Sequence, residues 1–454
     1  MREGFRQRQF FILVVDVLLM YATLVLALVI RRVALPTSES LLTHFRHFSF
    51  LFLGWVVVFY TLGLYKLERP FDDAAFARKT LSGILVSGLG SALYFYVSPG
   101  AGIEPKSVLA IFAGLYAVIF WIWRYSYGRR KRSIGQRIGV GFIGLQPEAL
   151  DLMRELRTAS PLGYDARFAY GQAESTLPPG VRNVTDPRGI RAAAVETGSD
   201  LIVIAEQTSL PEDVTRELFC LLDRRTRFMR LPDFYELILR RVPIGAINEM
   251  WFLENIDLRA KLPYETGKRV IDILVALTLL VLSLPFWPLI ALAIRAESSG
   301  PVFFRQTRLG RSDKPFSMIK FRTMKTDGND QAPTVKDDAR ITRVGRVLRA
   351  TRMDELPQVL NILTGDMSFV GPRPERPELA AELEKAIPYY RQRHLVKPGV
   401  TGWDQVSGEY HSPSVADTMK KLQYDFYYLK NMSLYFDVSI TFKTIMTVLQ
   451  RQGR

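Results

Sequence analysis

The chain has 454 residues, of which 48% are hydrophobic, and a formal net charge of +15 at pH 7. This length exceeds what one hydrophobic core comfortably holds, so roughly two to four structural units are expected, and the charge indicates anionic partners such as phospholipid headgroups, phosphorylated substrates or nucleic acid. The single cysteine, Cys220, excludes an internal disulfide framework and a cysteine-based zinc site, and the four scattered histidines argue against histidine-rich metal chemistry.

Four long apolar segments lie near the N-terminus. Each is close to the roughly 20 apolar residues that cross the hydrocarbon core of a bilayer, and they occupy 10–30, 48–65, 81–97 and 107–123. A soluble helical bundle would need a polar face, which these segments lack. Residues 1–132 are therefore predicted to form a four-helix transmembrane bundle, with Asp16 of the first segment facing its interior.

The charges that flank these segments predict the orientation of the bundle. Basic residues gather before the first segment, between the second and the third, and after the fourth, where Arg124 begins a basic run. Few occupy the alternate loops. Because basic loops stay in the cytoplasm, both ends of the bundle are predicted to be cytoplasmic.

Residues 133–260 alternate short strand patterns with amphipathic helices, which predicts a Rossmann-like α/β domain with a doubly wound sheet. Gly139-Val-Gly141-Phe-Ile-Gly144 formally matches the dinucleotide fingerprint. Its glycines fall inside the predicted strand, however, whereas the fingerprint must occupy the turn that follows the strand. The domain is therefore expected to hold no cofactor and to serve as a regulatory or assembly surface.

A fifth apolar run extends from Val270 to Ile294, with basic residues at both ends and Pro285 and Pro288 near its middle. The flanking charges give no asymmetry that would drive translocation, and proline breaks or bends a helix. A crossing would also export everything that follows. Residues 268–295 are therefore predicted to form a re-entrant membrane helix that breaks near Pro285. A kinked fifth span is the alternative.

The stretch MDELPQVLNILTGDMSFVGPRP at residues 353–374 places an acid pair, Asp354 and Glu355, before a short helical pattern. Proline is tolerated only in the first helical turn, so Pro357 predicts that Asp354 stands at or near the N-cap. The simplest interpretation is a capping aspartate. A helix N-terminus also suits a phosphoryl group, and an ionised carboxylate there can attack phosphorus when magnesium relieves the charge repulsion.

Arginines lie on both sides of the acid pair. In Gly371-Pro-Arg-Pro374 the prolines restrict the backbone, which predicts that Arg373 clamps a phosphate. Before the pair, arginines recur at every third position, and on an α-helix they would form an inclined ridge. This ridge is either solvated or set against anionic headgroups, with its end reaching the substrate phosphates. The arginines are Arg340, Arg343, Arg346, Arg349 and Arg352.

A second ordered loop is predicted at Lys397-Pro-Gly-Val-Thr-Gly-Trp403. Trp403 either anchors the core or contacts substrate, and the sequence leaves both interpretations open.

Residues 303–324, the acid-pair stretch and residues 394–408 together resemble the bacterial sugar transferase family of monotopic phosphoglycosyl transferases. The closer resemblance is to its larger members, the polyprenyl-phosphate hexose-1-phosphate transferases of exopolysaccharide and O-antigen initiation. It covers about 267–454 by motif and the preceding residues by architecture alone. The implied fold is a multidomain α/β membrane protein in which residues 261–454 form a mixed α/β catalytic domain containing the re-entrant helix.

The resemblance implies an enzyme that transfers a hexose 1-phosphate from a UDP-sugar to a polyprenyl phosphate such as undecaprenyl phosphate, and releases UMP. The active site would lie on the cytoplasmic face of the bacterial inner membrane, among membrane lipids. Nucleic acid is not an expected partner, and a homodimer is left open. The competing hypothesis is a catalytically inactive membrane protein with an assembly or regulatory role in a polysaccharide system. The identity of the hexose is not predicted.

The resemblance also implies roles for single residues. Asp354 is the nucleophile that holds the phosphosugar covalently, and Glu355 acts as a base or a metal ligand. Mg²⁺ is the implied cofactor, bound by these two carboxylates. The other matched positions, which the resemblance assigns to substrate and phosphate binding or, for the last, to the membrane break, are Lys320, Arg349, Arg373, Asp425 and Pro285.

Overall fold

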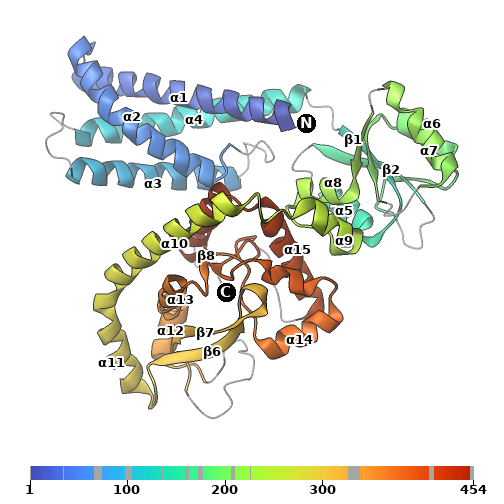
Figure 1. Ribbon diagram of the computed structural model, residues 1–454. Helices are drawn as coiled ribbons and strands as arrows, with labels where there is room; N and C mark the ends of the chain where they lie inside the picture. Colours follow the sequence, from blue (N-terminus) through green and yellow to red (C-terminus); the bar gives the residue numbers. More distant parts are fainter. Residues whose placement is uncertain are drawn as a thin grey trace. The chain divides into compact units, whose positions relative to one another are not determined.

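The chain divides into two compact units, Met1–Leu231 and Pro232–Arg454, which Figure 1 shows as a ribbon. The structure is a computed structural model that describes residues 2–33, 35–65, 74–97, 105–134, 138–158, 163–171, 177–205, 210–224, 226–325, 338, 340–407 and 414–449.

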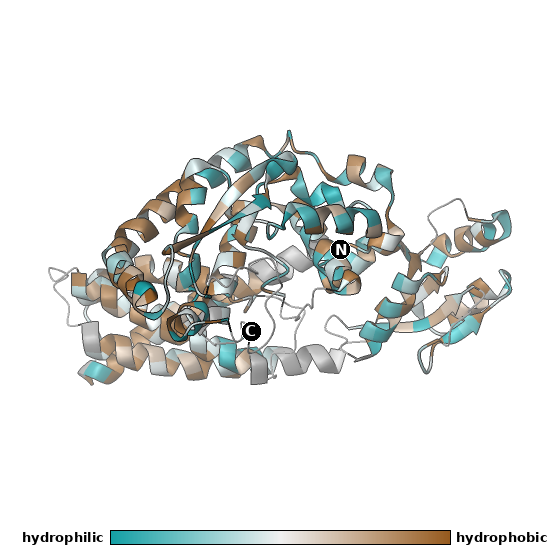
Figure 2. Cartoon of the chain, turned by 90° about the horizontal axis from the view of Figure 1, so that it is seen from below, coloured by the Kyte–Doolittle hydropathy of each residue, from teal (hydrophilic) through white to brown (hydrophobic). Residues whose placement is uncertain are grey.

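Four long helices open the first unit. They are α1 (Arg2–Arg32), α2 (Ser38–Thr61), α3 (Ala74–Val97) and α4 (Pro105–Ile134). Each contains a stretch that is long and apolar enough to cross a membrane, and Figure 2 shows hydrophobic residues concentrated on the long helices. Their common core is aromatic: the Trp55 ring packs edge-on against Phe112, which stacks on Tyr116. The four predicted apolar helices are confirmed.

A buried ion pair joins the first and last helices of this bundle. Arg124 Nη2 of α4 lies 2.6 Å from Asp16 Oδ2 of α1, and neither side chain is exposed. The Arg124 guanidinium also packs over the rings of Tyr65 and Phe120. The predicted interior position of Asp16 is confirmed, but Arg124 is not a flanking charge, because it lies within α4 and is neutralised there. Residues 66–73, whose charges also entered the predicted orientation, lie outside the described residues.

The rest of the first unit is a parallel α/β domain. Its sheet has the order β3-β2-β1-β4-β5, and all neighbouring strands are parallel, which is the doubly wound arrangement predicted from the sequence. The strands are β1 (Ile138–Ile143), β2 (Tyr164–Tyr170), β3 (Arg182–Val184), β4 (Ser199–Ile204) and β5 (Arg227–Arg230). The helices between them are α5 (Pro147–Thr158), α6 (Gly189–Glu196) and α7 (Glu212–Phe219).

Two glycines of the fingerprint-like motif lie inside β1, as predicted. A Cβ on Gly141 would come within 2.2 Å of the Phe168 ring, and a Cβ on Gly139 within 2.5 Å of the Gly198 carbonyl oxygen. These glycines therefore allow close packing around the central strand, which accounts for them without a bound dinucleotide.

The second unit begins earlier than the limit at residue 260 predicted from the sequence. It includes α8 (Leu231–Leu239) from its second residue and all of α9 (Glu249–Asn255). Trp251 of α9 shares a core with Leu383 and Phe426, and Val242 N donates to Gln423 O at 3.0 Å. The connection after the α/β domain is therefore part of the C-terminal core.

The C-terminal unit surrounds two small sheets with helices. β6 (Phe303–Leu309) and β7 (Pro315–Phe321) form an antiparallel hairpin, and β8 (Ser368–Val370) pairs in parallel with β9 (Gly399–Thr401). The helices that follow the hairpin are α12 (Arg343–Ala350), α13 (Gln358–Thr364), α14 (Pro377–Ala386), α15 (Val415–Asn431) and α16 (Leu434–Leu449). Trp403 is buried against Phe436 and donates from Nε1 to Arg240 O at 2.9 Å, so it anchors the core.

A broken apolar helix precedes the hairpin. α10 (Leu262–Ser283) is followed by the 3₁₀ turn η3 (Leu284–Phe286) and then α11 (Trp287–Glu297), so the predicted break falls at Pro285. Both halves attach to the C-terminal unit. In α10, Asp272 Oδ1 accepts from Phe369 N at 3.1 Å, and at the end of α11 Glu297 accepts from the backbone of Arg343 at 2.6 Å.

Candidate active site

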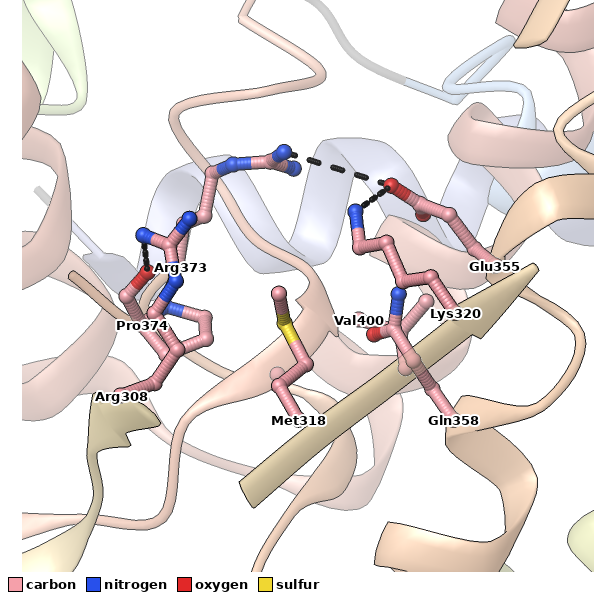
Figure 3. A pocket seen from close by; sticks show the side chains of 9 residues that line it. Arg308, Met318, Lys320, Glu355, Gln358, Arg373, Pro374 and Val400 are labelled. Atoms are coloured by element: carbon pink, nitrogen blue, oxygen red, sulfur yellow. Dashed lines mark hydrogen bonds and ion pairs between the residues drawn. The ribbon is translucent and has the colours of Figure 1, made fainter. Parts of the chain in front are cut away.

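A pocket in the C-terminal unit collects residues from segments that are far apart in the sequence (Figure 3). The hairpin, the acid pair, the start of α13, the Gly-Pro-Arg-Pro turn and β9 each contribute to its wall. The lining residues are Arg308, Met318, Lys320, Glu355, Gln358, Arg373, Pro374, Gly399 and Val400. Three of the predicted site residues, Lys320, Glu355 and Arg373, are therefore brought together.

The β6–β7 hairpin supplies one wall of the pocket with the side chains of one of its two faces. Residues opposite each other in an antiparallel pair share a face, and the register places Arg308 opposite Phe316 and Phe304 opposite Lys320. Arg308 and Lys320 therefore point to the same side. The Lys320 ammonium reaches across to Glu355, with Nζ 2.9 Å from Oε1.

The acid pair lies in a short 3₁₀ turn, η5 (Met353–Glu355), rather than at a helix cap. Arg352 before it is left-handed, with φ 57°, and α13 begins only at Gln358, preceded by Pro357 without any side-chain cap. Asp354 therefore does not stand at the N-cap of α13, which is Pro357, and the simple capping interpretation is excluded, because the 3₁₀ turn takes up the residues that the helical pattern assigned to the first turn. The acid pair is thus separated from the start of α13 by Leu356 and Pro357.

The two carboxylates differ in their electrostatic surroundings. Burial by itself raises the pKa of Glu355, but Lys320 and Arg373 outweigh it and bring the pKa to about 2. Burial raises the pKa of Asp354, and the charge of Glu355 adds to this, against the opposing effect of Lys320 and Arg349. Glu355 is therefore held in its ionised form as the partner of Lys320, while Asp354 has the weaker electrostatic stabilisation of the two carboxylates.

Asp354 also has an unused oxygen. The residue is only 8% exposed, and its Oδ1 has no hydrogen-bond partner among the described residues. A buried polar atom without a partner is costly unless a ligand completes it. Such an oxygen fits the magnesium expected from the resemblance, because Mg²⁺ is commonly held by one or two carboxylates together with substrate phosphates and water. Within the described residues, no cluster of three or more acidic, histidine or cysteine side chains forms a metal site of its own.

Of the two predicted phosphate-binding arginines, Arg373 lines the pocket and Arg349 does not. Arg373 is 44% exposed, with Nη2 4.0 Å from Glu355 Oε1, so it reaches the pocket as expected. Arg349 lies beside the acid pair and donates from Nε to Thr323 Oγ1 at 2.8 Å, while burial lowers its pKa and the charge of Asp354 opposes that effect.

The predicted ridge of arginines does not form as one helical row. Arg343, Arg346 and Arg349 lie in α12, but Arg340 precedes the helix, and Arg352 follows it in the left-handed conformation. Arg340 Nη2 forms an ion pair with Asp338 Oδ2 at 2.7 Å. Only the three central arginines therefore share a helix. The repeat of arginine at every third position does not show where the helix begins and ends, so it overestimated the length of the row.

Asp425 is not among the pocket-lining residues. It is 2% exposed in α15, where its Oδ2 lies 2.8 Å from Arg393 Nη2, and burial raises its pKa to about 7 against the opposing charge of Arg393. The position of Asp425 therefore does not support a direct contact with substrate. Its partner Arg393 is a residue that the sequence did not single out.

Two polar residues of the pocket were not singled out from the sequence. Arg308 was detectable, because strand alternation places it on the same hairpin face as Lys320. Gln358 directly follows the acid-pair motif and is 3% exposed, yet no local pattern distinguishes it from an ordinary core polar residue. The loop around Trp403 contributes through Gly399 and Val400, while Trp403 itself stays in the core.

Comparisons with known proteins agree on one family. The bacterial sugar transferase family model matches residues 263–451. The chain is 30% identical over 407 residues to the UDP-glucose:undecaprenyl-phosphate glucose-1-phosphate transferase of Escherichia coli K12, covering 88% of this chain and 81% of that protein.

Another relative is named for a different sugar donor. The chain is 45% identical over 223 residues to the UDP-N-acetylgalactosamine-undecaprenyl-phosphate N-acetylgalactosaminephosphotransferase of Aeromonas hydrophila, covering 48% of this chain and 51% of that protein. The matched region thus spans about half the length of this relative.

Proposed function

Because the chain belongs to the bacterial sugar transferase family, we propose that it transfers a sugar 1-phosphate from a UDP-sugar to undecaprenyl phosphate in a bacterial inner membrane. The products are undecaprenyl diphosphate sugar and UMP, and the reaction begins exopolysaccharide or O-antigen synthesis. The observation that carries this proposal is the buried, unpartnered Oδ1 of Asp354 beside the Lys320–Glu355–Arg373 cluster.

In the first step, Asp354 attacks the sugar-bearing phosphorus of the donor. The new bond joins a carboxylate oxygen to phosphorus, the diphosphate P–O bond breaks, and its electrons leave with UMP. Asp354 suits this role better than Glu355, because Glu355 is engaged by Lys320 at 2.9 Å whereas Asp354 keeps a free oxygen lone pair.

In the second step, a phosphate oxygen of the lipid attacks the same phosphorus. The bond to Asp354 breaks, and the carboxylate is regenerated. Arg373 and Lys320 counter the negative charge of the phosphoryl group in both steps, and the arginine fork suits phosphate oxygens. Mg²⁺ bound by Asp354 and assisted by Glu355 would screen the charge repulsion between carboxylate and diphosphate.

The broken helix supports an active site at the membrane surface. Only 11% of its most apolar window is buried, and exposed apolar side chains line both halves, among them Leu282, Phe286 and Leu289. Asp272 and Glu297 tie both halves to one domain, which supports a segment that enters the membrane and returns on the same side. With the predicted cytoplasmic face, the site meets a soluble donor and a lipid phosphate together.

The competing hypothesis of an inactive assembly protein is not favoured. The relatives described above are named as transferases, and the charged residues expected of an active site are retained. No specific observation points to an assembly role.

The experiment is a donor-only reaction with purified protein. Incubation with labelled UDP-glucose and UDP-N-acetylgalactosamine, without lipid, is expected to release UMP in an amount equal to the enzyme and to leave a phosphosugar on the peptide containing Asp354. The Asp354→Asn variant should release none. Normal turnover by this variant would refute the assigned nucleophile, and no transfer by the unchanged protein with any UDP-sugar and undecaprenyl phosphate would refute the function.

A further inference from the structure

The turn that carries Arg373 is held through its carbonyl groups. Pro372 and Pro374 have no backbone N–H, so this turn has few donors with which to fix itself. Instead three consecutive carbonyls accept hydrogen bonds: Pro372 O from Gly399 N at 2.9 Å, Arg373 O from Arg393 Nη2 at 3.0 Å and Pro374 O from Arg308 Nη1 at 3.0 Å. Two of the three donors are guanidinium groups.

Arg393 is itself held from two other sides. The residue is 4% exposed, its Nε and Nη2 lie 3.0 and 2.8 Å from Asp425 Oδ2, and its Nη1 donates to Tyr390 Oη at 2.8 Å. Every nitrogen of the guanidinium thus has a partner, and one of those partners is the backbone of the phosphate-binding turn. Arg393 and Tyr390 both lie in the 3₁₀ helix η6 (Tyr390–Leu395), which follows α14, so the guanidinium connects η6 and α15 to the backbone of Arg373.

A buried ion pair is an expensive way to stabilise a fold, because two charges must be removed from water. Apolar residues of similar size often stabilise a core equally well. The buried charges of Arg393 and Asp425 therefore indicate that the pair holds a particular geometry. The hydrogen bond from Arg393 to Arg373 O shows which group is held. A backbone shift at Arg373 would be amplified along its long side chain, whose end must meet a phosphate within a few tenths of an ångström.

We propose that Arg393, oriented by Asp425 and Tyr390, is a positioning residue that fixes the Arg373 turn for phosphate binding. The inference rests on the proposed function and explains why Asp425, far inside α15, belongs to the site without lining its pocket. Arg393 does not touch substrate. Its whole effect on the bound phosphate passes through Arg373.

The test is a double-mutant cycle on the Kd for UDP, which requires no turnover. In the parent protein, Arg393→Lys keeps the charge but not the planar fork, and should weaken UDP binding about tenfold. In an Arg373→Gln background the same change should weaken it less than about twofold, because the clamp is already absent. A purely structural role would lower the melting temperature equally in both backgrounds and leave the two Kd ratios equal.

Tyr390→Phe provides a milder second variant if Arg393→Lys fails to fold. It removes one acceptor and should show the same dependence on Arg373 with a smaller ratio. Arg391→Lys is the matched control, since Arg391 is 66% exposed and pairs with Asp313, and it should leave the Kd unchanged. Equal weakening in both backgrounds, or weakening in neither, overturns the inference. Coupling in the Kd without sugar-phosphate transfer counts against the proposed function alone.

Discussion

Asp354 and Glu355 are adjacent residues in one turn, yet the groups around them drive their pKa values apart. Glu355 is paired with Lys320 and has a pKa of about 2, whereas burial and the Glu355 charge raise the pKa of Asp354 above its ordinary value. A proton that enters the site on acidification therefore goes to Asp354. The proposed nucleophile is therefore protonated first, while Glu355, the partner of Lys320, stays ionised.

This difference predicts the acid limb of the donor half-reaction. UMP release should fall as the pH drops through the pKa of Asp354, at a pH above the ordinary 3.8 of an aspartate. Lys320→Met removes a charge that lowers this pKa and should move the limb to higher pH, whereas Glu355→Gln removes a charge that raises it and should move the limb to lower pH. Single-turnover UMP release across about pH 4 to 8 measures both shifts.

Lys385→Met is the control for this experiment, because Lys385 is an exposed cation of α14. It should leave the limb in place. Shifts of the same sign in the two active-site variants would show that Asp354 is not the titrating group.

At the scale of elements, close backbone contact places α12 beside the hairpin. Gly345 lies in the first turn of α12, where an added Cβ would come within 2.0 Å of the Thr323 carbonyl oxygen. Arg349, one turn further along, donates to the hydroxyl of the same threonine at 2.8 Å. The glycine thus allows the approach that brings Arg349 to the acid pair.

Gly345→Ala is therefore expected to destabilise the protein by about 1–3 kcal/mol, because a rigid carbonyl cannot yield to the methyl group. It should also reduce UMP release by displacing Arg349. Gly267→Ala is the matched helical control: its Cβ would lie 3.5 Å from Leu434, and alanine should add up to about 1 kcal/mol of stability. Thermal unfolding in detergent separates the two, and equal melting temperatures would contradict the packing argument.

In the membrane bundle, helices α1 and α4 are linked by the ion pair between Asp16 and Arg124. Arg124→Met should cost about 3–5 kcal/mol, because it removes the ion-pair partner of the buried Asp16 carboxyl group. The double variant Asp16→Leu, Arg124→Met should recover most of that loss, since an apolar pair of similar volume fills the same space. The melting temperature and the amount of protein recovered from the membrane measure the stability of the single and double variants. A double variant no more stable than the single one would mean that the pair contributes more than charge compensation.

At the scale of the whole molecule, the proposed function requires the C-terminal unit on the cytoplasmic side. Cys220 is the only cysteine, so a Cys220→Ser background permits labelling at one introduced thiol. Thr351→Cys, exposed after α12, should react with a membrane-impermeant reagent only after permeabilisation, whereas Glu39→Cys, exposed at the start of α2, should react in intact spheroplasts. Labelling of Thr351→Cys in intact spheroplasts would exclude a re-entrant α10–α11 segment.

Much of this architecture was predictable, because it depends on local patterns. Apolar length identified the bundle helices, alternating strand and helix patterns identified the parallel sheet, and Pro285 identified the break. The acid pair and Lys320 were singled out by their chemical types. The early limit of the second unit was not predictable, since Trp251 belongs to the C-terminal core only through its contact with residues such as Phe426.

The sequence by itself thus determined the elements and the chemical groups of the site, because hydropathy, periodicity and proline act over a few residues. Tertiary structure alone decided which groups meet. It left an oxygen of Asp354 without a partner, joined Glu355 to Lys320 and placed Arg393 between Asp425 and the backbone of Arg373. The physical reason is that burial, pKa and hydrogen-bond partners arise from contacts between distant segments, which no short stretch of sequence encodes.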